Sequence, residues 1–293
     1  MRHSPENGTA IPFWKMEGCG NDYLYVELTT LAPELGRWVE QNAAALAPDM
    51  TDRNFGVGGD GLVLLAKDPT ADVRMVMYNA DGSRGATCGN ALRCIAMHMG
   101  RDRVTIATDS GQVVARLVGE LAEVEMGAPI FEAAAIPFVP AVADVRGGGG
   151  DTPWRIGMTL EGVQEGYVLS MGNPHCIAFV DDDPQTIDLP ALARPLQAAP
   201  FFPDSCNVEI VRAVDGLLEQ RTYERGTGET LACGSGACAV AVAAVHSGLR
   251  PHGTPIQIRL AGGSLTITYR TDGSLVMRGP ARRVFEGSYR ARR

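Results

Sequence analysis

The fold of this chain is decided by a stretch that occurs twice: YNADGSRGATCG at residues 78–89 and YERGTGETLACG at residues 223–234. Both stretches begin with tyrosine and end with Cys-Gly, and the copies are 145 residues apart at either end. Self-similarity at a fixed offset is the sequence signature of a duplicated unit. The chain is therefore predicted to contain two copies of one module, one carrying Cys88 and the other Cys233.

Shorter matches extend the repeat on both sides of this stretch. Residues 20–22 (GND) correspond to residues 172–174 (GNP). Residues 111–114 and 124–127 correspond in the same way to residues 263–266 and 276–279. These outer matches share an offset of 152 residues and keep their order in both halves. The conserved order within the chain favours one duplication, with the boundary between the copies in residues 128–137.

The local patterns predict an α+β module. Short β-rich runs bounded by turn residues predict strands at residues 23–28, 62–65, 73–78, 208–211 and 265–269. A helical stretch follows each Cys-Gly, at residues 91–99 before Gly100 and at residues 236–245 before Gly248. The second helix is apolar on every side, and such a helix must be enclosed by protein. Each module is therefore expected to be a curved sheet around one central helix.

Composition restricts the classes of partner. The 293 residues carry a formal net charge of −8, with a pI near 5.2, which argues against nucleic acid or an anionic membrane as the main partner. No apolar run reaches the length of a membrane span. Residues 1–10 lack the apolar core of a signal peptide. The expected location is the cytoplasm.

Cysteine and lysine usage restricts the chemistry. The seven cysteines are an odd number in a chain without an export signal, so a disulfide framework is not expected. A buried cysteine is by default a small hydrophobic residue, and this interpretation suits Cys94 and Cys238 best because they lie within apolar helix. The basic residues include only two lysines, Lys15 and Lys67. A pyridoxal-phosphate enzyme needs a lysine for its Schiff base, so that chemistry is disfavoured.

The position of Cys88 and Cys233 before a helix has two chemical consequences. The partial positive charge of a helix N-terminus favours thiolate, which lowers a cysteine pKa from about 8.5 toward roughly 3.5–7.5. The first N–H groups of each helix, from Gly89 and Asn90 and from Gly234 and Ser235, are a site for a carboxylate. Two cysteines on opposite faces of an α-carbon would invert it without a cofactor, one acting as thiolate and the other as thiol.

Two other interpretations of the repeated cysteines remain open. Zinc binding is one, although Cys88 is six residues from Cys94 and Cys233 is five from Cys238, which are not the short spacings of structural zinc sites. A redox pair is the other, because two facing thiols can oxidise to a disulfide.

Seven ordered blocks, found between Phe13 and Gly287, resemble the diaminopimelate epimerases. They are FWKMEGCGND (13–22), NADGS (79–83), CGN (88–90), GNPH (172–175), NVE (207–209), ERGTGET (224–230) and CGSG (233–236). The resemblance implies interconversion of LL- and meso-diaminopimelate, in lysine and cell-wall precursor synthesis, without metal or pyridoxal phosphate. It also implies a homodimer of two-module chains with the active site in the cleft between the modules. The modules are then residues 1–132 with 279–293, and residues 133–278.

Site roles follow from the same resemblance. Cys88 and Cys233 match the two proton-transfer residues, and Gly89, Asn90, Gly234 and Ser235 match the positions whose N–H groups hold the reacting carboxylate. The matching substrate-binding side chains are Asn21, Asn79, Asn173, Asn207, Glu224 and Arg225. His175 and Glu224 are also candidates for tuning the thiols. Gly61 stands where some members of the family have glutamine.

Two rival hypotheses follow from these observations. The first is another racemase of the same fold, acting on proline or hydroxyproline, for which Glu224, Arg225 and the asparagines would be surplus. The second is a non-catalytic thiol protein, either a redox sensor or a metal binder.

Overall fold

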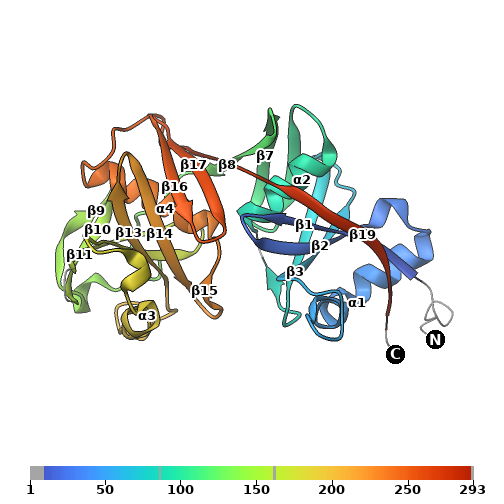
Figure 1. Cartoon of the computed structure of the whole chain (residues 1–293), viewed down its shortest axis with the longest axis horizontal. Helices are drawn as coiled ribbons and strands as arrows, with labels where there is room; N and C mark the ends of the chain where they lie inside the picture. Colours follow the sequence, from blue (N-terminus) through green and yellow to red (C-terminus); the bar gives the residue numbers. More distant parts are fainter. Residues whose placement is uncertain (1–9, 86, 161–162, 292–293) are drawn as a thin grey trace. The chain divides into compact units, whose positions relative to one another are not determined.

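The structure is a computed structural model that describes residues 10–85, 87–160 and 163–291 (Figure 1). It divides into two compact units. Unit 1 runs to Val124 and includes the C-terminal segment from Pro280, and unit 2 is Glu125–Gly279. No helix among the described residues is both long enough and apolar enough to cross a membrane.

Unit 1 is built mainly of strands. These are β1 (Ala10–Gly18), β2 (Asn21–Glu27), β3 (Gly61–Ala66), β4 (Val73–Asn79), β5 (Arg84–Gly85), β6 (Val104–Thr108), β7 (Gly111–Val118), β8 (Leu121–Gly127) and β19 (Arg282–Arg290). Its helices are α1 (Pro33–Thr51), α2 (Gly89–Met99) and the short 3-10 helix η1 (Leu28–Thr30).

Unit 2 has the same kind of composition. Its strands are β9 (Val145–Gly149), β10 (Thr152–Leu160), β11 (Val163–Ser170), β12 (Pro174–Phe179), β13 (Asn207–Val214), β14 (Leu217–Glu224), β15 (Gly228–Thr230), β16 (Pro255–Leu260), β17 (Gly263–Tyr269) and β18 (Leu275–Gly279). Its helices are α3 (Leu189–Gln197), α4 (Gly234–His246) and the 3-10 helices η2 (Pro140–Val142) and η3 (Pro184–Thr186).

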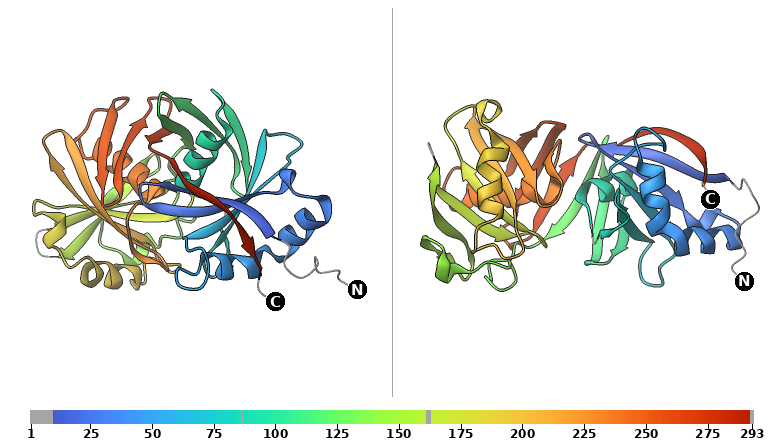
Figure 2. Two further views of the ribbon diagram at one scale, coloured as in Figure 1. Left: turned by 45° about the vertical axis from the view of Figure 1, so that its right-hand side comes forward. Right: turned by 90° about the horizontal axis from the view of Figure 1, so that it is seen from below.

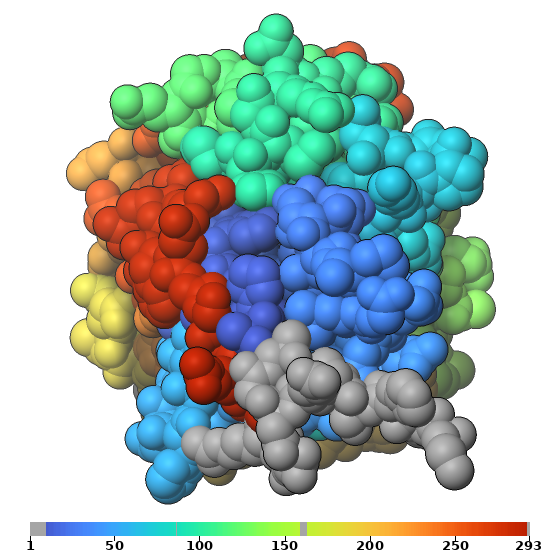
Figure 3. All heavy atoms as spheres, turned by 90° about the vertical axis from the view of Figure 1, so that its right-hand side faces the viewer, coloured from blue at the N-terminus to red at the C-terminus, as the bar shows by residue number. Residues whose placement is uncertain are grey.

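The strand pairings of the two units repeat each other. In unit 1, β1–β2 is antiparallel, β2–β3 parallel, β3–β4 antiparallel, β4–β6 parallel and β6–β7 antiparallel. In unit 2, β11–β12, β12–β13, β13–β14, β14–β16 and β16–β17 follow the same sequence of directions. The strand β19 pairs antiparallel with β1, as β10 pairs with β11. Figure 3 shows the C-terminal segment, in red, lying beside the first strands of the chain, in dark blue. The predicted α+β class and the duplication are thus confirmed.

Each sheet curves around a central helix (Figure 2). The helix α2 begins after Cys88 and ends at Gly100, whose φ of 62° suits the left-handed position that closes a helix. The helix α4 is Ala- and Val-rich, and ten of its thirteen residues are buried. The predicted central helices are therefore confirmed, each beginning two residues earlier than its apolar pattern.

A second helix covers the other face of each sheet, and the sequence analysis did not predict either one. The helix α1 buries Val39, Ala43 and Leu46 against Leu62 and other residues of unit 1. The helix α3 is capped by Asp188, whose Oδ1 accepts from the Ala191 N–H at 3.1 Å. Because helices cover both faces, the strands β3 and β13 are buried on both sides.

Candidate active site

Both cysteines of the repeat cap a central helix. Cys88 and Cys233 have extended backbones, with φ of −145° and −120°, so α2 and α4 start at the next residue. The first N–H groups of an α-helix have no partner within the helix. Each unit therefore presents a sulfur beside backbone donors that suit a carboxylate. This geometry is the one expected for Gly89, Asn90, Gly234 and Ser235.

Cys88 lies among amide side chains. Its Sγ is half-buried and lies 3.7 Å from Oδ1 of Asn21, which also accepts from Nδ2 of Asn90 at 3.1 Å. Nδ2 of Asn21 in turn donates to Oδ2 of Asp60 at 2.7 Å. The structure thus brings three predicted site residues of unit 1 together, with Asn21 held by a carboxylate.

Asp60, which holds Asn21, belongs to an ionic network that the sequence patterns did not predict. Nζ of Lys15 lies 2.6 Å from Oδ2 of Asp22, and Arg53 bridges Asp22 and Asp60 at 2.7 and 2.8 Å. Burial alone would raise the pKa of Asp22, but hydrogen bonds from Arg53 and Lys15 lower it overall. Burial raises the pKa of Asp60. The sequence held a partial signal, because Lys15 and Asp22 lie within the first block of the resemblance.

Asn79 is not held against Cys88 by any contact of its side chain that the structure describes. It is exposed at the end of β4, where its Nδ2 donates to Oγ of Ser83 at 2.9 Å and its backbone N–H donates to the Ser83 carbonyl. Gly61 is opposite Asn79 in the sheet. A Cβ on Gly61 would lie 2.5 Å from the Tyr78 carbonyl and 2.8 Å from the Tyr23 ring. Glycine is therefore required here by close packing.

Cys233 lies in a different environment, beside carboxylates. Its Sγ lies 3.5 Å from Oγ of Ser235 and accepts from the Gly236 N–H at 3.4 Å. Burial raises the pKa of Cys233 well above 9.0, and the negative charges of Glu224 and Glu209 add to that effect. The expectation that a helix start lowers this pKa is therefore wrong for Cys233, because burial and two carboxylates outweigh the partial charge of the helix.

Glu224 connects Cys233 to the rest of the unit 2 site. Its Oε1 accepts from Oγ1 of Thr230 at 2.6 Å, and its side chain also contacts Cys233. Burial raises the pKa of Glu224, the charge of Glu209 raises it further, and His175 opposes the rise. This contact places the side chain of Glu224 at the sulfur, and its role in tuning the thiol stays a prediction.

The remaining predicted residues of unit 2 form two groups. Oδ1 of Asn207 accepts from the backbone N–H of Arg225 at 2.8 Å, and Nη1 of Arg225 donates to the Asp204 carbonyl at 3.0 Å. Nε2 of His175 lies 3.0 Å from Oδ1 of Asn173. Nδ1 of His175 lies 2.8 Å from Oε1 of Glu209, and both of these side chains are fully buried. Glu209 lies in the NVE block but had been assigned no role.

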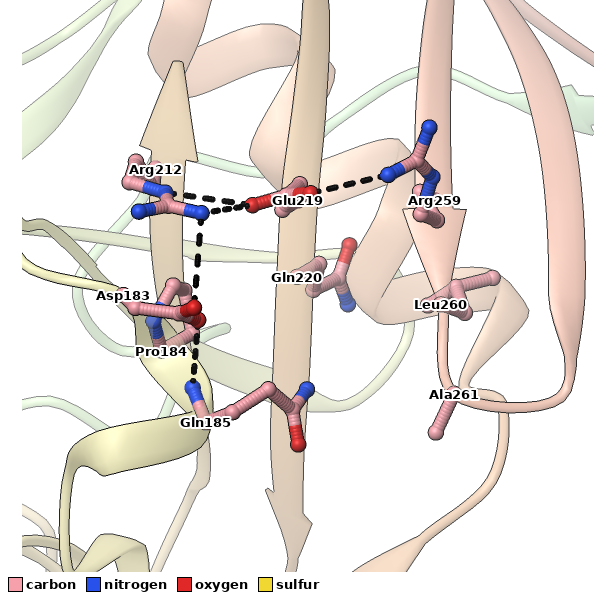
Figure 4. Close-up of a pocket in the computed structure, with 9 residues that line it drawn as sticks. All are labelled: Asp183, Pro184, Gln185, Arg212, Glu219, Gln220, Arg259, Leu260 and Ala261. Carbon is pink, nitrogen blue, oxygen red and sulfur yellow. Dashed lines mark hydrogen bonds and ion pairs between the residues drawn. The ribbon is translucent and has the colours of Figure 1, made fainter. Parts of the chain in front are cut away.

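A surface pocket of about 260 Å³ lies elsewhere in unit 2, between η3, β14 and β16 (Figure 4). Glu219 stands between Arg212 and Arg259, at 2.7 and 2.9 Å, and Asp183 lies 3.7 Å from Arg212. The charges in this pocket are therefore paired with one another. None of the predicted site residues lines it.

The other five cysteines, Cys19, Cys94, Cys176, Cys206 and Cys238, are buried. Within the described part of the chain, no group of three or more His, Cys, Asp or Glu side chains is arranged to hold a metal ion.

Solved structures of low sequence identity share the fold. A PhzF-family phenazine biosynthesis protein of Bacillus anthracis superposes with a TM-score of 0.68 at 14% identity, covering 96% of this chain and 99% of that one. A hydroxyproline epimerase from Agrobacterium vitis superposes with a TM-score of 0.59 at 16% identity, covering 96% and 92%. At these identities the likeness concerns the fold alone.

Sequence similarity identifies the family. A family model described as diaminopimelate epimerase matches residues 13–132 and 167–284. The diaminopimelate epimerase of Leptospira biflexa is 38% identical, covering 94% of this chain and 98% of that protein, and that of Bacillus mycoides is 37% identical, covering 94% and 96%. On this similarity, which extends over nearly its whole length, the chain belongs to the diaminopimelate epimerase family.

Proposed function

We propose that this chain interconverts LL- and meso-diaminopimelate by moving an α-proton between Cys88 and Cys233. One observation carries the proposal: each unit of a duplicated fold places a cysteine at the first turn of its central helix. Family membership supplies the substrate, since the similar proteins of Leptospira biflexa and Bacillus mycoides are named diaminopimelate epimerases. The product would serve lysine and peptidoglycan precursor synthesis.

The proposed reaction needs one thiolate and one thiol. The thiolate removes the α-proton from one face of the substrate carbon, and the thiol of the other cysteine donates a proton to the opposite face. The proton count balances, and the enzyme returns with the roles of the two sulfurs exchanged. Positioned general acids and bases typically contribute about 10²–10⁴-fold each. The proposal requires the two units to present their sulfurs to a single α-carbon.

Backbone N–H groups stabilise the intermediate in this proposal. Those at Gly89, Asn90, Gly234 and Ser235 would hold the α-carboxylate, onto which the negative charge of the carbanion spreads. Preformed donors are effective because they need no reorganisation during the reaction.

Side chains around the two helix starts bind the remainder of the substrate in this proposal. Arg225 is exposed and can pair with a carboxylate. The amides of Asn21, Asn79, Asn173 and Asn207 supply donors and acceptors for the two amino-acid ends. Because the side chain of Glu224 contacts Cys233, we assign Glu224 to tuning the protonation of this sulfur.

The decisive experiment is incubation of the pure, reduced protein with LL-diaminopimelate in deuterated water. The proposal predicts meso product that carries deuterium at the inverted α-carbon. Parallel reactions with L-proline and trans-4-hydroxy-L-proline test the rival racemase hypothesis. Exchange on proline or hydroxyproline, without exchange on diaminopimelate, would contradict the proposed substrate. Absence of exchange on all three would favour the non-catalytic thiol protein.

We also propose that the chain acts as a cytoplasmic homodimer, as the family resemblance implies. The strand β19 supports a second copy as a partner, because eight of its nine residues are exposed. Val284 and Phe285 on this strand are exposed hydrophobic residues, at 46% and 43%. Sedimentation equilibrium of the wild type and of Phe285→Glu tests this, since a dimer through β19 requires the variant to dissociate more readily.

A further inference from the structure

Glu209 occupies a place that the other unit fills with an apolar side chain. On β13, Glu209 pairs with Thr222 of β14, and on β3, Val63 pairs with Met77 of β4. Thr222 and Met77 are equivalent in the repeat, since each directly precedes its tyrosine. Glu209 and Val63 are therefore structural counterparts, and both are fully buried.

The neighbours of Glu209 differ from their counterparts in the same way. Gln220 and Thr222 are buried on β14, at 3% and 2% exposure, where β4 has the buried residues Met75 and Met77. In unit 1, apolar side chains fill the equivalent positions of the sheet. A buried carboxylate costs free energy unless it is well paired. Packing therefore does not require a carboxylate at position 209, and its presence indicates a chemical role.

The contacts of Glu209 lead to two predicted site residues. Nδ1 of His175 lies 2.8 Å from its Oε1, and a carboxylate in this pairing accepts from the Nδ1–H. Nδ1 of His175 therefore carries a proton, and Nε2 lies 3.0 Å from Oδ1 of Asn173, which is an acceptor atom as well. Oε2 of Glu209 has no hydrogen-bond partner among residues 10–85, 87–160 and 163–291.

The same carboxylate lies against the first turn of α4. A Cβ built on Gly236 would lie only 2.5 Å from Oε1 of Glu209, whereas the counterpart of Gly236 in the repeat of unit 1 is Ala91. The N–H of Gly236 is the donor that holds Sγ of Cys233 at 3.4 Å. The negative charge of Glu209 therefore sits directly beneath the turn that positions the sulfur.

We propose that Glu209 is a positioning residue for the Cys233 half of the reaction, which sets the protonation of Cys233 and Glu224 without touching the substrate. It does so in two ways, by fixing the Nδ1 proton of His175 and by placing a carboxylate charge under the start of α4. The inference rests on the proposed function, but its first readout is independent of substrate.

The electrostatic environment agrees with this assignment. The charge of Glu209 contributes to the raised pKa of Cys233 and to that of Glu224, after burial in both cases. The titratable groups that face Glu209 from the surrounding strands and helix are His175, Cys176, Cys206, Glu224 and Cys233. Only His175 among them adds positive charge, so the net effect of Glu209 is to keep Cys233 as a thiol.

The test measures the alkylation rate of Cys233 against pH in the full chain. Iodoacetamide labels the protein, and mass spectrometry follows the peptides containing Cys233 and Cys88 separately. Glu209→Gln keeps the shape and an acceptor for His175 but removes the charge. The alkylation midpoint, which is the pH at which Cys233 reacts at half its maximal rate, should fall by roughly one pH unit or more. This is the change expected when a like charge is removed nearby. The midpoint for Cys88 should not move.

A matched control separates charge from loss of a buried polar group. Gln220→Met introduces the residue type that unit 1 has at the equivalent buried position. This variant should leave the alkylation midpoint of Cys233 unchanged. With diaminopimelate, Glu209→Gln should lower kcat about tenfold or more at nearly constant KM and shift the pH profile. An unchanged midpoint in Glu209→Gln, or an equal shift in Gln220→Met, would overturn the inference.

A measurement on the wild type needs no folded variant. The ¹⁵N chemical shift of His175 should show a protonated Nδ1 throughout pH 6–9, and an unprotonated Nδ1 would refute the role of Glu209. The wild type can show a proton on Nδ1 of His175 and a raised alkylation midpoint of Cys233 without epimerising diaminopimelate. In that case the proposed function fails and the role of Glu209 stands.

Discussion

The two cysteine sites share a backbone but differ in side-chain chemistry. In unit 1 the sulfur of Cys88 lies beside the amide of Asn21, which an ionic network holds in place. In unit 2 the sulfur of Cys233 lies beside Glu224, with the buried pair of His175 and Glu209 behind it. Duplication therefore preserved the geometry of the helix start, while substitutions at equivalent positions made the two sulfurs chemically unequal.

The difference shows how a symmetric fold can serve an asymmetric step. Asn79 and Glu224 are equivalent in the repeat, yet only Glu224 carries a charge that titrates near a sulfur. A reaction that needs one thiolate and one thiol at the same moment makes different demands on the surroundings of its two sulfurs. Substitutions at matched positions of the two units test this difference.

The largest effect is expected from removing either sulfur. Cys88→Ala and Cys233→Ala should each lower epimerisation by about 10³-fold or more, since each deletes one of the two groups that transfer the proton in the proposed mechanism. The measurement is the rate of meso-diaminopimelate formation, with thermal unfolding to confirm that each variant is folded. Turnover close to the wild-type rate in either variant would exclude that cysteine from the mechanism.

An intermediate effect is expected from the unequal pair Glu224 and Asn79. Glu224→Gln should lower kcat by about 10–100-fold and lower the alkylation midpoint of Cys233, because a negative charge beside the thiolate is lost. The pKa of Glu224 is raised from 4.5, so an acid limb of kcat above pH 4.5 should belong to the wild type and vanish in the variant.

Asn79→Ala is the matched change in unit 1. It should raise KM by a few-fold and leave the pH profile in place, because an amide does not titrate. Equal changes in the pH profiles of the two variants would show that the comparison between the units is wrong.

The smallest effect is expected on stability, from the ionic network of unit 1. Asp22→Asn removes the carboxylate that pairs with Lys15, and the side chains of Asp22 and Lys15 are largely buried, at 12% and 14% exposure. The expected loss is about 2 kcal/mol of unfolding free energy, below the range for fully buried pairs because Arg53 is 58% exposed.

The pH dependence of this loss has a defined sign. The pKa of Asp22 is lowered in the folded state from 3.8, so its contribution is present above pH 4 and is lost as pH falls through the folded pKa. Urea unfolding at pH 7 and pH 3 measures it, and the difference between variant and wild type should shrink at pH 3. Glu34→Gln removes the exposed pair with Arg37 and serves as the control without measurable change. A difference that grows at pH 3 would contradict the assignment.

Much of the fold could be predicted from local patterns. The five predicted strands lie in β2, β3, β4, β13 and β17, and the two central helices lie in α2 and α4. The outer helices α1 and α3 were not predicted. Pro48 in α1 and Pro195 in α3 interrupt the usual helical pattern, and burial against the sheet stabilises these helices in spite of the prolines.

Short stretches of sequence and their order are enough to predict the duplication, the family and the position of Cys88 and Cys233 at helix starts. The protonation of Cys233 follows only from the folded chain. His175, Glu209 and Glu224 come from three strands, β12, β13 and β14, whose side chains meet only when the sheet forms around α4. A pKa depends on burial and on neighbouring charge, and both are properties of the folded chain.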